Sequence, residues 1–173
     1  VCTSVSPASP DVVDQAMSSV YERVVLLDAR LEGICVAQAQ GTEGSVLVIA
    51  PARRSRVAPR TENIVCYPCR DQRDVGLDHG PGDRPGRVPS DAEAGFPITA
   101  TVYTLGRRTR LTDIRATLRD DSDRHIPTWT ALPSDAPRSA PSYAATVGMV
   151  PMVPLEPGTK YIALVEFRVD GRP

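Results

Sequence analysis

The chain has 173 residues, a formal net charge of −1, 41% hydrophobic residues and 24% charged residues. This length suffices for one sizeable core, and the balanced charge excludes a globally basic nucleic-acid binder and an acidic disordered tail. No stretch approaches the roughly 18 consecutive apolar residues that a membrane-spanning helix requires. The chain begins at Val1 without methionine or a basic and apolar leader, which predicts a processed product or a segment of a longer protein.

The first ten residues, 1–10, are rich in serine and proline and show no helical periodicity, so they are expected to form an extended arm. In an extended strand, alternate side chains lie on one face. Val1, Thr3 and Val5 would therefore share a face of this arm.

Residues 11–52 are expected to form a helix followed by a β-hairpin. A serine, a proline and an aspartate at 9–11 are typical of a helix start, and apolar residues at spacings of three and four predict a helix ending near Leu27. Two apolar runs, 34–37 and 46–49, flank a Gly-Thr-Glu-Gly turn, which predicts the hairpin.

A break at residues 51–61 follows, with two prolines and four arginines. It could be a basic patch for nucleic acid or an acidic surface, or a solvated linker. The absence of interleaved aromatic residues and of an overall basic excess favours a linker at 53–61. The four arginines concerned are Arg53, Arg54, Arg56 and Arg60.

Residues 62–173 are expected to form a β-sandwich or barrel, because short apolar runs recur between turn residues. The last run alternates most clearly, which predicts one buried face. The predicted strands are 64–67, 98–105, 111–118, 126–132, 143–150 and 161–169.

Before the last predicted strand, the residues Leu155-Glu-Pro157-Gly158-Thr159-Lys-Tyr161 match the pattern L-x-P-G-T-x-Y. This segment resembles a motif that precedes a late strand in many bacterial immunoglobulin-like and fibronectin-like domains. In such domains the tyrosine hydroxyl bonds back to the preceding backbone, the arrangement called a tyrosine corner. The resemblance implies this role for Tyr161, with Pro157 and Gly158 forming the turn.

A wider resemblance covers most of residues 19–170. The segments that carry it are Ser19-Val-Tyr-Glu-Arg23, Leu26-Leu-Asp28, Val65-Cys-Tyr-Pro68, Asp71-Gln-Arg-Asp-Val75 and Gly95-Phe-Pro-Ile-Thr99. The first two are similar to the C-terminal part of bacterial secreted proteins of the CAP (SCP-like) superfamily, and the other three are similar to the immunoglobulin-like module that follows it in some of them. The resemblance implies a mainly β protein in which an immunoglobulin-like sandwich follows a small helix and hairpin element.

The chain departs from that family at both ends. The histidines and glutamates of the CAP cleft belong to an earlier half that this sequence lacks, and the only histidines here are His79 and His125. Modules of this type usually continue past V-D-G-[KR]-P into one more strand, whereas this sequence stops at Pro173. The resemblance therefore implies a sandwich that lacks its last strand.

Four cysteines, Cys2, Cys35, Cys66 and Cys69, are the main candidates for covalent chemistry. The C-x-x-C spacing of the last two is typical of redox sites, but a thioredoxin-type site needs a helix start where a strand end is expected. A secreted origin favours disulfides, with all three pairings open. A zinc site from all four is less favoured, because Cys2 and Cys35 form no C-x-x-C knuckle.

The remaining candidates favour structure over chemistry, so no catalytic residue, metal or cofactor is expected. The acidic run 120–123 lacks the spacing of a calcium loop and falls where a turn is expected. His79 is expected to be an exposed loop residue, His125 to begin a strand, and Trp129 to pack in the sandwich.

Two functional hypotheses follow. The first is a non-enzymatic structural protein, outside the cell or at its surface, that self-associates by β-strand addition into a filament. Residues 1–10 would donate the strand, and Cys2 could lock the joint by a disulfide. The alternative is a binding, adhesion or spacer module, a remnant of a larger secreted CAP-superfamily protein, that reaches its ligand through the loop at 70–94. Neither involves nucleic acid or a membrane span.

Overall fold

The computed structural model describes residues 10–28, 31–41, 44–54, 63–79, 84–103, 109–136 and 144–170. The predicted arm, apart from Pro10, and residues 55–61 of the predicted linker lie outside the described residues. The helical elements are α1 (Pro10–Ser18), α2 (Arg23–Leu26) and a 3₁₀ turn η1 (Pro133–Asp135). The strands are β1 (Leu31–Gly41), β2 (Gly44–Arg54), β3 (Asn63–Tyr67), β4 (Ile98–Tyr103), β5 (Leu111–Asp120), β6 (His125–Ile126), β7 (Thr128–Ala131), β8 (Ala144–Pro151) and β9 (Tyr161–Val169).

The strands form three antiparallel sheets, which confirms that the protein is mainly β. The hairpin β1-β2 is a sheet of its own. The other two have the orders β3-β4-β8-β7 and β6-β5-β9. The bounds of β9 coincide with the predicted strand, and Gly41 pairs with Gly44 at the end of the predicted hairpin.

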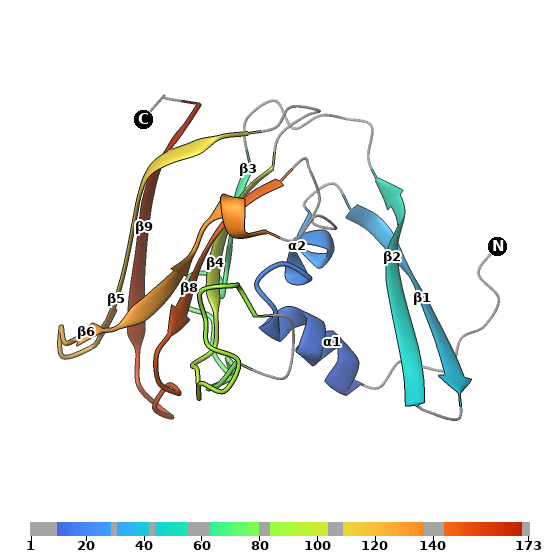
Figure 1. Ribbon diagram of the computed structural model, residues 1–173, viewed down its shortest axis with the longest axis horizontal. Coiled ribbons are helices and arrows are strands. Elements are labelled where there is room, and N and C mark those ends of the chain that lie inside the picture. Colours follow the sequence, from blue (N-terminus) through green and yellow to red (C-terminus); the bar gives the residue numbers. More distant parts are fainter. Residues whose placement is uncertain are drawn as a thin grey trace.

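The four-stranded sheet is the central layer of the molecule (Figure 1). Its inner face packs on the three-stranded sheet, where Val102 and Val147 meet Val165 and Phe167. Its outer face is covered by the helical segment, where Val20 and its neighbours pack in a second cluster. Further members of that cluster are Tyr21, Val88, Ala94, Ala131 and Val150, with Trp129 and Ala136 partly buried against it.

Strands β4 and β8 are buried on both faces as a result. Every residue of β4 after Ile98 and every residue of β8 after Ala144 is buried. A strand with one solvated face would alternate between buried and exposed positions. The continuous burial therefore follows from layers on both sides of this sheet.

The helical segment ends near Leu27 as predicted, but it is not one continuous helix. Instead of one helix to about Leu27, α1 ends at Ser18 and α2 starts at Arg23. The break contains Ser19, whose hydroxyl oxygen accepts a hydrogen bond from the Glu22 N–H at 3.3 Å. Serine side chains compete in this way for backbone groups that a continuous helix would use, which explains the interruption.

The run predicted as one strand at 126–132 is divided between the two sheets. β6 pairs with β5, and β7 pairs with β8. Pro127 lies between them and has no N–H for a ladder hydrogen bond. Its carbonyl instead accepts a hydrogen bond from the Met152 N–H at 2.9 Å. The proline therefore marks where the chain crosses from one sheet to the other.

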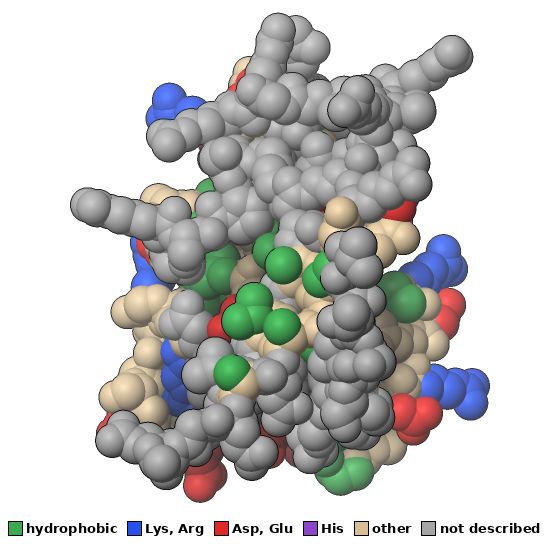
Figure 2. Space-filling view, turned by 90° about the vertical axis from the view of Figure 1, so that its right-hand side faces the viewer, with side chains coloured by type: hydrophobic (Ala, Val, Ile, Leu, Met, Phe, Trp, Pro, Cys, Tyr) green, Lys and Arg blue, Asp and Glu red, His purple; other side chains and the backbone are tan. Residues whose placement is uncertain are grey.

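The hairpin lies beside the helices, on the side away from the three-stranded sheet (Figure 1). Hydrophobic side chains are visible at the surface on this side of the molecule (Figure 2). The exposed apolar residues of the hairpin include Ile34, at 45%, and Val48, at 53%.

Candidate functional site: an open sheet edge

Strand β9 forms one edge of the three-stranded sheet. It pairs with β5 from Tyr161 opposite Asp120 to Val169 opposite Leu111, and no other described strand pairs with it. A sheet edge of this kind presents N–H and C=O groups that a further strand can pair with. The nine residues of β9 therefore form a template for strand addition.

Part of the inner face of β3 is exposed, although the inner face of the neighbouring strand β4 is buried. Ile64 pairs with Val102, and Cys66 pairs with Ala100. Paired residues of an antiparallel ladder lie on the same face, so Ile64 and Cys66 share the inner face of the sheet with the core residue Val102. Val102 is fully buried, yet Ile64 is 55% exposed and Cys66 is also exposed.

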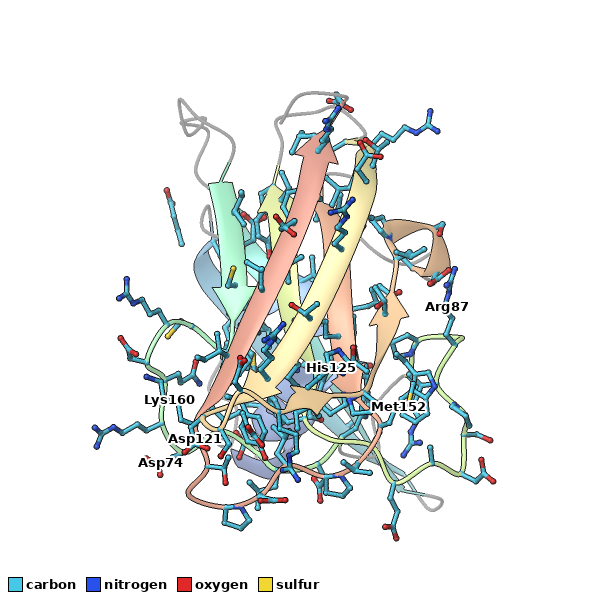
Figure 3. The ribbon with its side chains drawn as sticks, turned by 90° about the vertical axis from the view of Figure 1, so that its left-hand side faces the viewer. Asp74, Arg87, Asp121, His125, Met152 and Lys160 are labelled. Atoms are coloured by element: carbon cyan, nitrogen blue, oxygen red, sulfur yellow. The ribbon has the colours of Figure 1, made fainter. Side chains whose placement is uncertain are left out.

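The exposure of these two side chains has a simple geometric cause. Figure 3 looks onto the three-stranded sheet and shows much of β3 beyond the border that β9 makes. Ala163 of β9 pairs with the fully buried Leu118 and so lies on the inner face, but it too is exposed. We call the free edge of β9 together with Ile64, Cys66 and Ala163 the open edge.

The outer face of β9 is also apolar at one end. Ile162 is 57% exposed and Leu164 is 54% exposed. The same face becomes charged toward the end of the strand, at Glu166 and Arg168. An added strand would therefore meet an apolar outer surface only at the start of β9.

The turn that leads into β9 fixes the start of this edge. Pro157 and Gly158 occupy its centre, Gly158 has φ +72°, and the Thr159 N–H donates to the Glu156 carbonyl at 3.4 Å. Proline followed by a residue with positive φ is typical of a type II turn. The Tyr161 hydroxyl accepts a hydrogen bond from the Glu156 N–H at 2.8 Å, the form of contact expected in a tyrosine corner.

Arg23 anchors the helical segment to the end of β3 and the segment before β4. Its side chain is fully buried, and Nε donates to the Ser19 carbonyl at 2.7 Å. Nη1 donates to the Pro97 carbonyl at 2.8 Å, and the guanidinium lies 4.9 Å from the ring centre of Tyr67 and 5.1 Å from that of Phe96. Burial lowers the pKa of Arg23 to about 10, against a smaller raising effect of Tyr67.

Disulfides were expected with all three pairings open, and the described cysteines form none with one another. Cys66 and Cys69 are exposed free thiols, Cys35 is half-buried on β1, and Cys2 lies outside the described residues. Desolvation raises the pKa of the Cys66 thiol, whereas activation of a thiol requires a lowered pKa. Its position on β3 and this direction of shift do not fit a thioredoxin-type nucleophile.

The acidic run 120–123 forms a turn held together by Arg124. One oxygen of Asp120 accepts from the backbone N–H groups of Ser122 and Arg124, each at 3.0 Å. The other accepts from Arg124 Nε at 2.7 Å. These contacts use both oxygens of the carboxylate, and the described residues contain no group of three or more metal-ligating side chains.

The two histidines lie apart in different surroundings. The expectation of an exposed His79 is wrong, because the Asp78–Gly95 bridge and the His79 N–H bond to the Ala94 carbonyl hold it 5% exposed. His125 begins β6 as predicted and is exposed. It lines a pocket of about 200 Å³, below the roughly 300–1,000 Å³ typical of ligand sites.

The donor-arm candidates Val1, Thr3 and Val5 lie outside the described residues. The sequence patterns did not indicate the roles of Ile64 and Arg23. Ile64 and Cys66 alternate with Val65 and Tyr67, a pattern that predicts two faces but does not say which one lacks cover. Arg23 lies at the spacing of the apolar residues on the buried face of the predicted helix. This position was the one indication in the sequence that its side chain is buried.

Comparisons with known proteins leave the chain without an assigned family. No family model matches it, and neither a curated protein nor a solved structure matches it. Among the described residues, no helix is long and apolar enough to cross a membrane.

Proposed function

We propose that this is a non-enzymatic structural protein that is secreted by a bacterium. It self-associates by β-strand addition into a filament outside the cell or at its surface. The observation that carries the proposal is the open edge. The edge of β9 that faces away from β5 has no described partner strand, and inner-face side chains of β3 that a neighbouring strand would cover are exposed beside it. Strand addition satisfies the backbone of such an edge and buries its apolar side chains at the same time.

The sheet orders support an immunoglobulin-like sandwich as the scaffold. In that fold, strands A, B, E and D form one sheet and strands C, F and G form the other. The order β3-β4-β8-β7 matches A-B-E-D, and β5-β9 matches C-F, with β6 as an extra short strand beside β5. The position of strand G, next to β9, is the position that the donor strand would take.

The donor in this proposal is the arm, residues 1–10, of a second copy. Val1, Thr3 and Val5 would supply the alternate side chains, and a disulfide made by Cys2 or another cysteine could lock neighbouring subunits. The partner is thus a copy of the same chain, and nucleic acid has no part in the assembly.

Electron microscopy of the full chain and of a variant lacking residues 1–9 tests the proposal. The full chain is expected to form regular filaments, and the deletion variant is expected to remain monomeric with an unchanged circular dichroism spectrum. Undiminished filaments without residues 1–9 would exclude the arm as donor. A full chain that stays monomeric at all concentrations would exclude self-association.

The alternative is a binding or spacer module from a larger secreted protein of the CAP superfamily. Its ligand would be reached by the loop at 70–94, where Arg70, Asp71 and Arg73 are exposed. Such a module is expected to be monomeric, so the same electron microscopy experiment separates it from the structural protein.

A further inference from the structure

We infer that the open edge accepts the arm in one orientation only, with Val1, Thr3 and Val5 against Ile64 and Cys66 and with Cys2 turned outward. This inference rests on the proposed function and specifies its joint residue by residue. It assigns Cys66 as the thiol that the incoming strand covers, and it places Cys2 on the opposite face of that strand.

The side chains on the two sides match in character. The inner side of the open edge is apolar and contains Ile64, Cys66 and Ala163. Side chains of an added strand alternate between this inner side and the outer face of the sheet. Within residues 1–6 of the arm, the odd positions carry two valines and a threonine, whereas the even positions carry a cysteine and two serines. The odd positions therefore gain most from burial against Ile64.

The arm also has a suitable length. Pro7 has no N–H and interrupts a ladder, so the pairing segment is limited to residues 1–6. Six extended residues span about 20 Å, which is a typical strand length. They would cover about two thirds of the nine residues of β9. Since alternate side chains of a strand point to the same side, three of these six residues point inward. In the inferred orientation they are Val1, Thr3 and Val5.

The layers of the molecule favour donation to a second copy. The arm precedes α1, which belongs to the helical segment on the outer face of the four-stranded sheet (Figure 1). The open edge belongs to the three-stranded sheet on the inner face. Because the donor arm and the acceptor edge are different parts of the chain, one contact between two copies leaves a free arm on one copy and a free edge on the other. Such a head-to-tail contact extends into an open chain.

Disulfide trapping between two distinguishable copies tests the orientation. The acceptor copy lacks residues 1–9, carries C35S and C69S, and keeps Cys66 as its one thiol. The donor copy carries a size tag and the substitutions C35S, C66S and C69S, so that its one thiol lies in the arm. Three donor variants are compared: one keeps the native Cys2, one carries C2S and T3C, and one carries C2S and S4C. Under mild oxidation, T3C is expected to form the mixed disulfide at least about tenfold faster than Cys2 or S4C, because a disulfide requires Cα atoms within about 7 Å and converging side chains.

Two control acceptors make the result specific. The first carries C66S in addition to C35S and C69S, has no thiol, and is expected to form no mixed disulfide. The second carries C35S and C66S, keeps Cys69 as its one thiol, and is also expected to form none. Equal or faster trapping of Cys2 or S4C would overturn the inferred orientation. Trapping of Cys69 would place the strand elsewhere.

The outcomes for the inference and for the proposed function are separate. If filaments of the full chain form but no arm cysteine reacts with Cys66, the inference is wrong and another segment is the donor. If T3C in a full-length copy that keeps Cys66 gives only an intramolecular disulfide, the arm closes its own sandwich, and head-to-tail assembly is excluded. If neither association nor trapping occurs, the proposed function itself fails.

Discussion

Arg23 joins three parts of the molecule through one side chain. Its guanidinium donates hydrogen bonds to the carbonyls of Ser19 and Pro97 and lies over the rings of Tyr67 and Phe96. The pKa of about 10 keeps it charged at neutral pH. At this position the helical segment is therefore held to the sheet by a charged group that donates hydrogen bonds to backbone carbonyls. Removing the guanidinium leaves those buried carbonyls without their hydrogen-bond donor.

We predict that Arg23→Met lowers the free energy of unfolding by about 2–4 kcal/mol, because hydrogen bonds to a charged group are lost in a buried setting. Urea denaturation followed by tryptophan fluorescence measures the loss. Arg119→Met is the control, since Arg119 forms an exposed ion pair with Asp123 and such pairs contribute about 0–1 kcal/mol. Similar losses in the two variants would contradict the anchoring role of Arg23.

The protonation state of Asp120 affects the stability of the folded protein. Burial raises the pKa of its carboxyl, but hydrogen bonds from Arg124 and Ser122 outweigh this effect, so the pKa lies below its ordinary value. A carboxyl with a lowered pKa in the folded state adds stability above its unfolded pKa of about 3.9, and this stability disappears as the pH falls through the folded-state value.

We therefore expect Asp120→Asn to be less stable than the wild type at pH 7 and to lose less stability between pH 5 and pH 2. Thermal unfolding at several pH values measures both effects. Asp121→Asn, in the same turn, is the control and should retain the acid sensitivity of the wild type. A wild-type slope in Asp120→Asn would show that other groups cause the acid sensitivity.

At the scale of elements, the contact between the helical segment and the four-stranded sheet depends on a glycine. A Cβ atom at Gly148 of β8 would lie 3.0 Å from Cγ1 of Val20 and 3.3 Å from Cβ of Ala131. Both distances are tighter than ordinary van der Waals contact. The small residue therefore lets the helical segment approach β7 and β8 closely.

We predict that Gly148→Ala destabilises the protein by about 1–3 kcal/mol, the usual effect of overpacking a core. Gly86→Ala is the control, because no atom lies within 4 Å of the Cβ position at Gly86, and its effect should stay within about 0.5 kcal/mol. Differential scanning calorimetry of both variants gives the comparison. A Gly148→Ala protein as stable as Gly86→Ala would contradict the packing of Val20 on β8.

The open edge is a property of the whole molecule, because it arises where two sheets of unequal width meet. β3 belongs to the four-stranded sheet and β9 to the three-stranded sheet. Neither strand alone indicates that Ile64 lacks cover. A substitution at Ile64 can therefore separate folding of the monomer from association.

We predict that Ile64→Lys leaves the free energy of unfolding of the monomer within about 0.5 kcal/mol, because the side chain is already 55% exposed. Association should weaken at least about tenfold, because an added strand would bury an unpaired charge. Ile34→Lys, on the hairpin at 45% exposure, is the control and should associate like the wild type. Sedimentation velocity over a range of concentrations measures association, and equal weakening in both variants would argue against the open edge.

Local patterns predicted several elements well. The alternation of Val165, Phe167 and Val169 with charged residues defined β9, and the glycines at 41 and 44 defined the hairpin. These predictions succeed because the periodicity of a strand and the conformation of a turn depend on neighbouring residues. The break at Ser19 and the crossing at Pro127 were not predicted, because the choice between a continued element and an interruption depends on tertiary packing.

Local residue patterns are enough to predict a mainly β protein, a helix and hairpin in its first part, and an alternating last strand. Which strands share a sheet, which faces are covered and why the inner face of β3 is exposed beside β9 follow from the packed fold alone. Burial depends on residues that are far apart in the chain. Ile64 and Val102 have adjacent positions on one face of one sheet, yet one is 55% exposed and the other fully buried, because the opposing sheet ends between them.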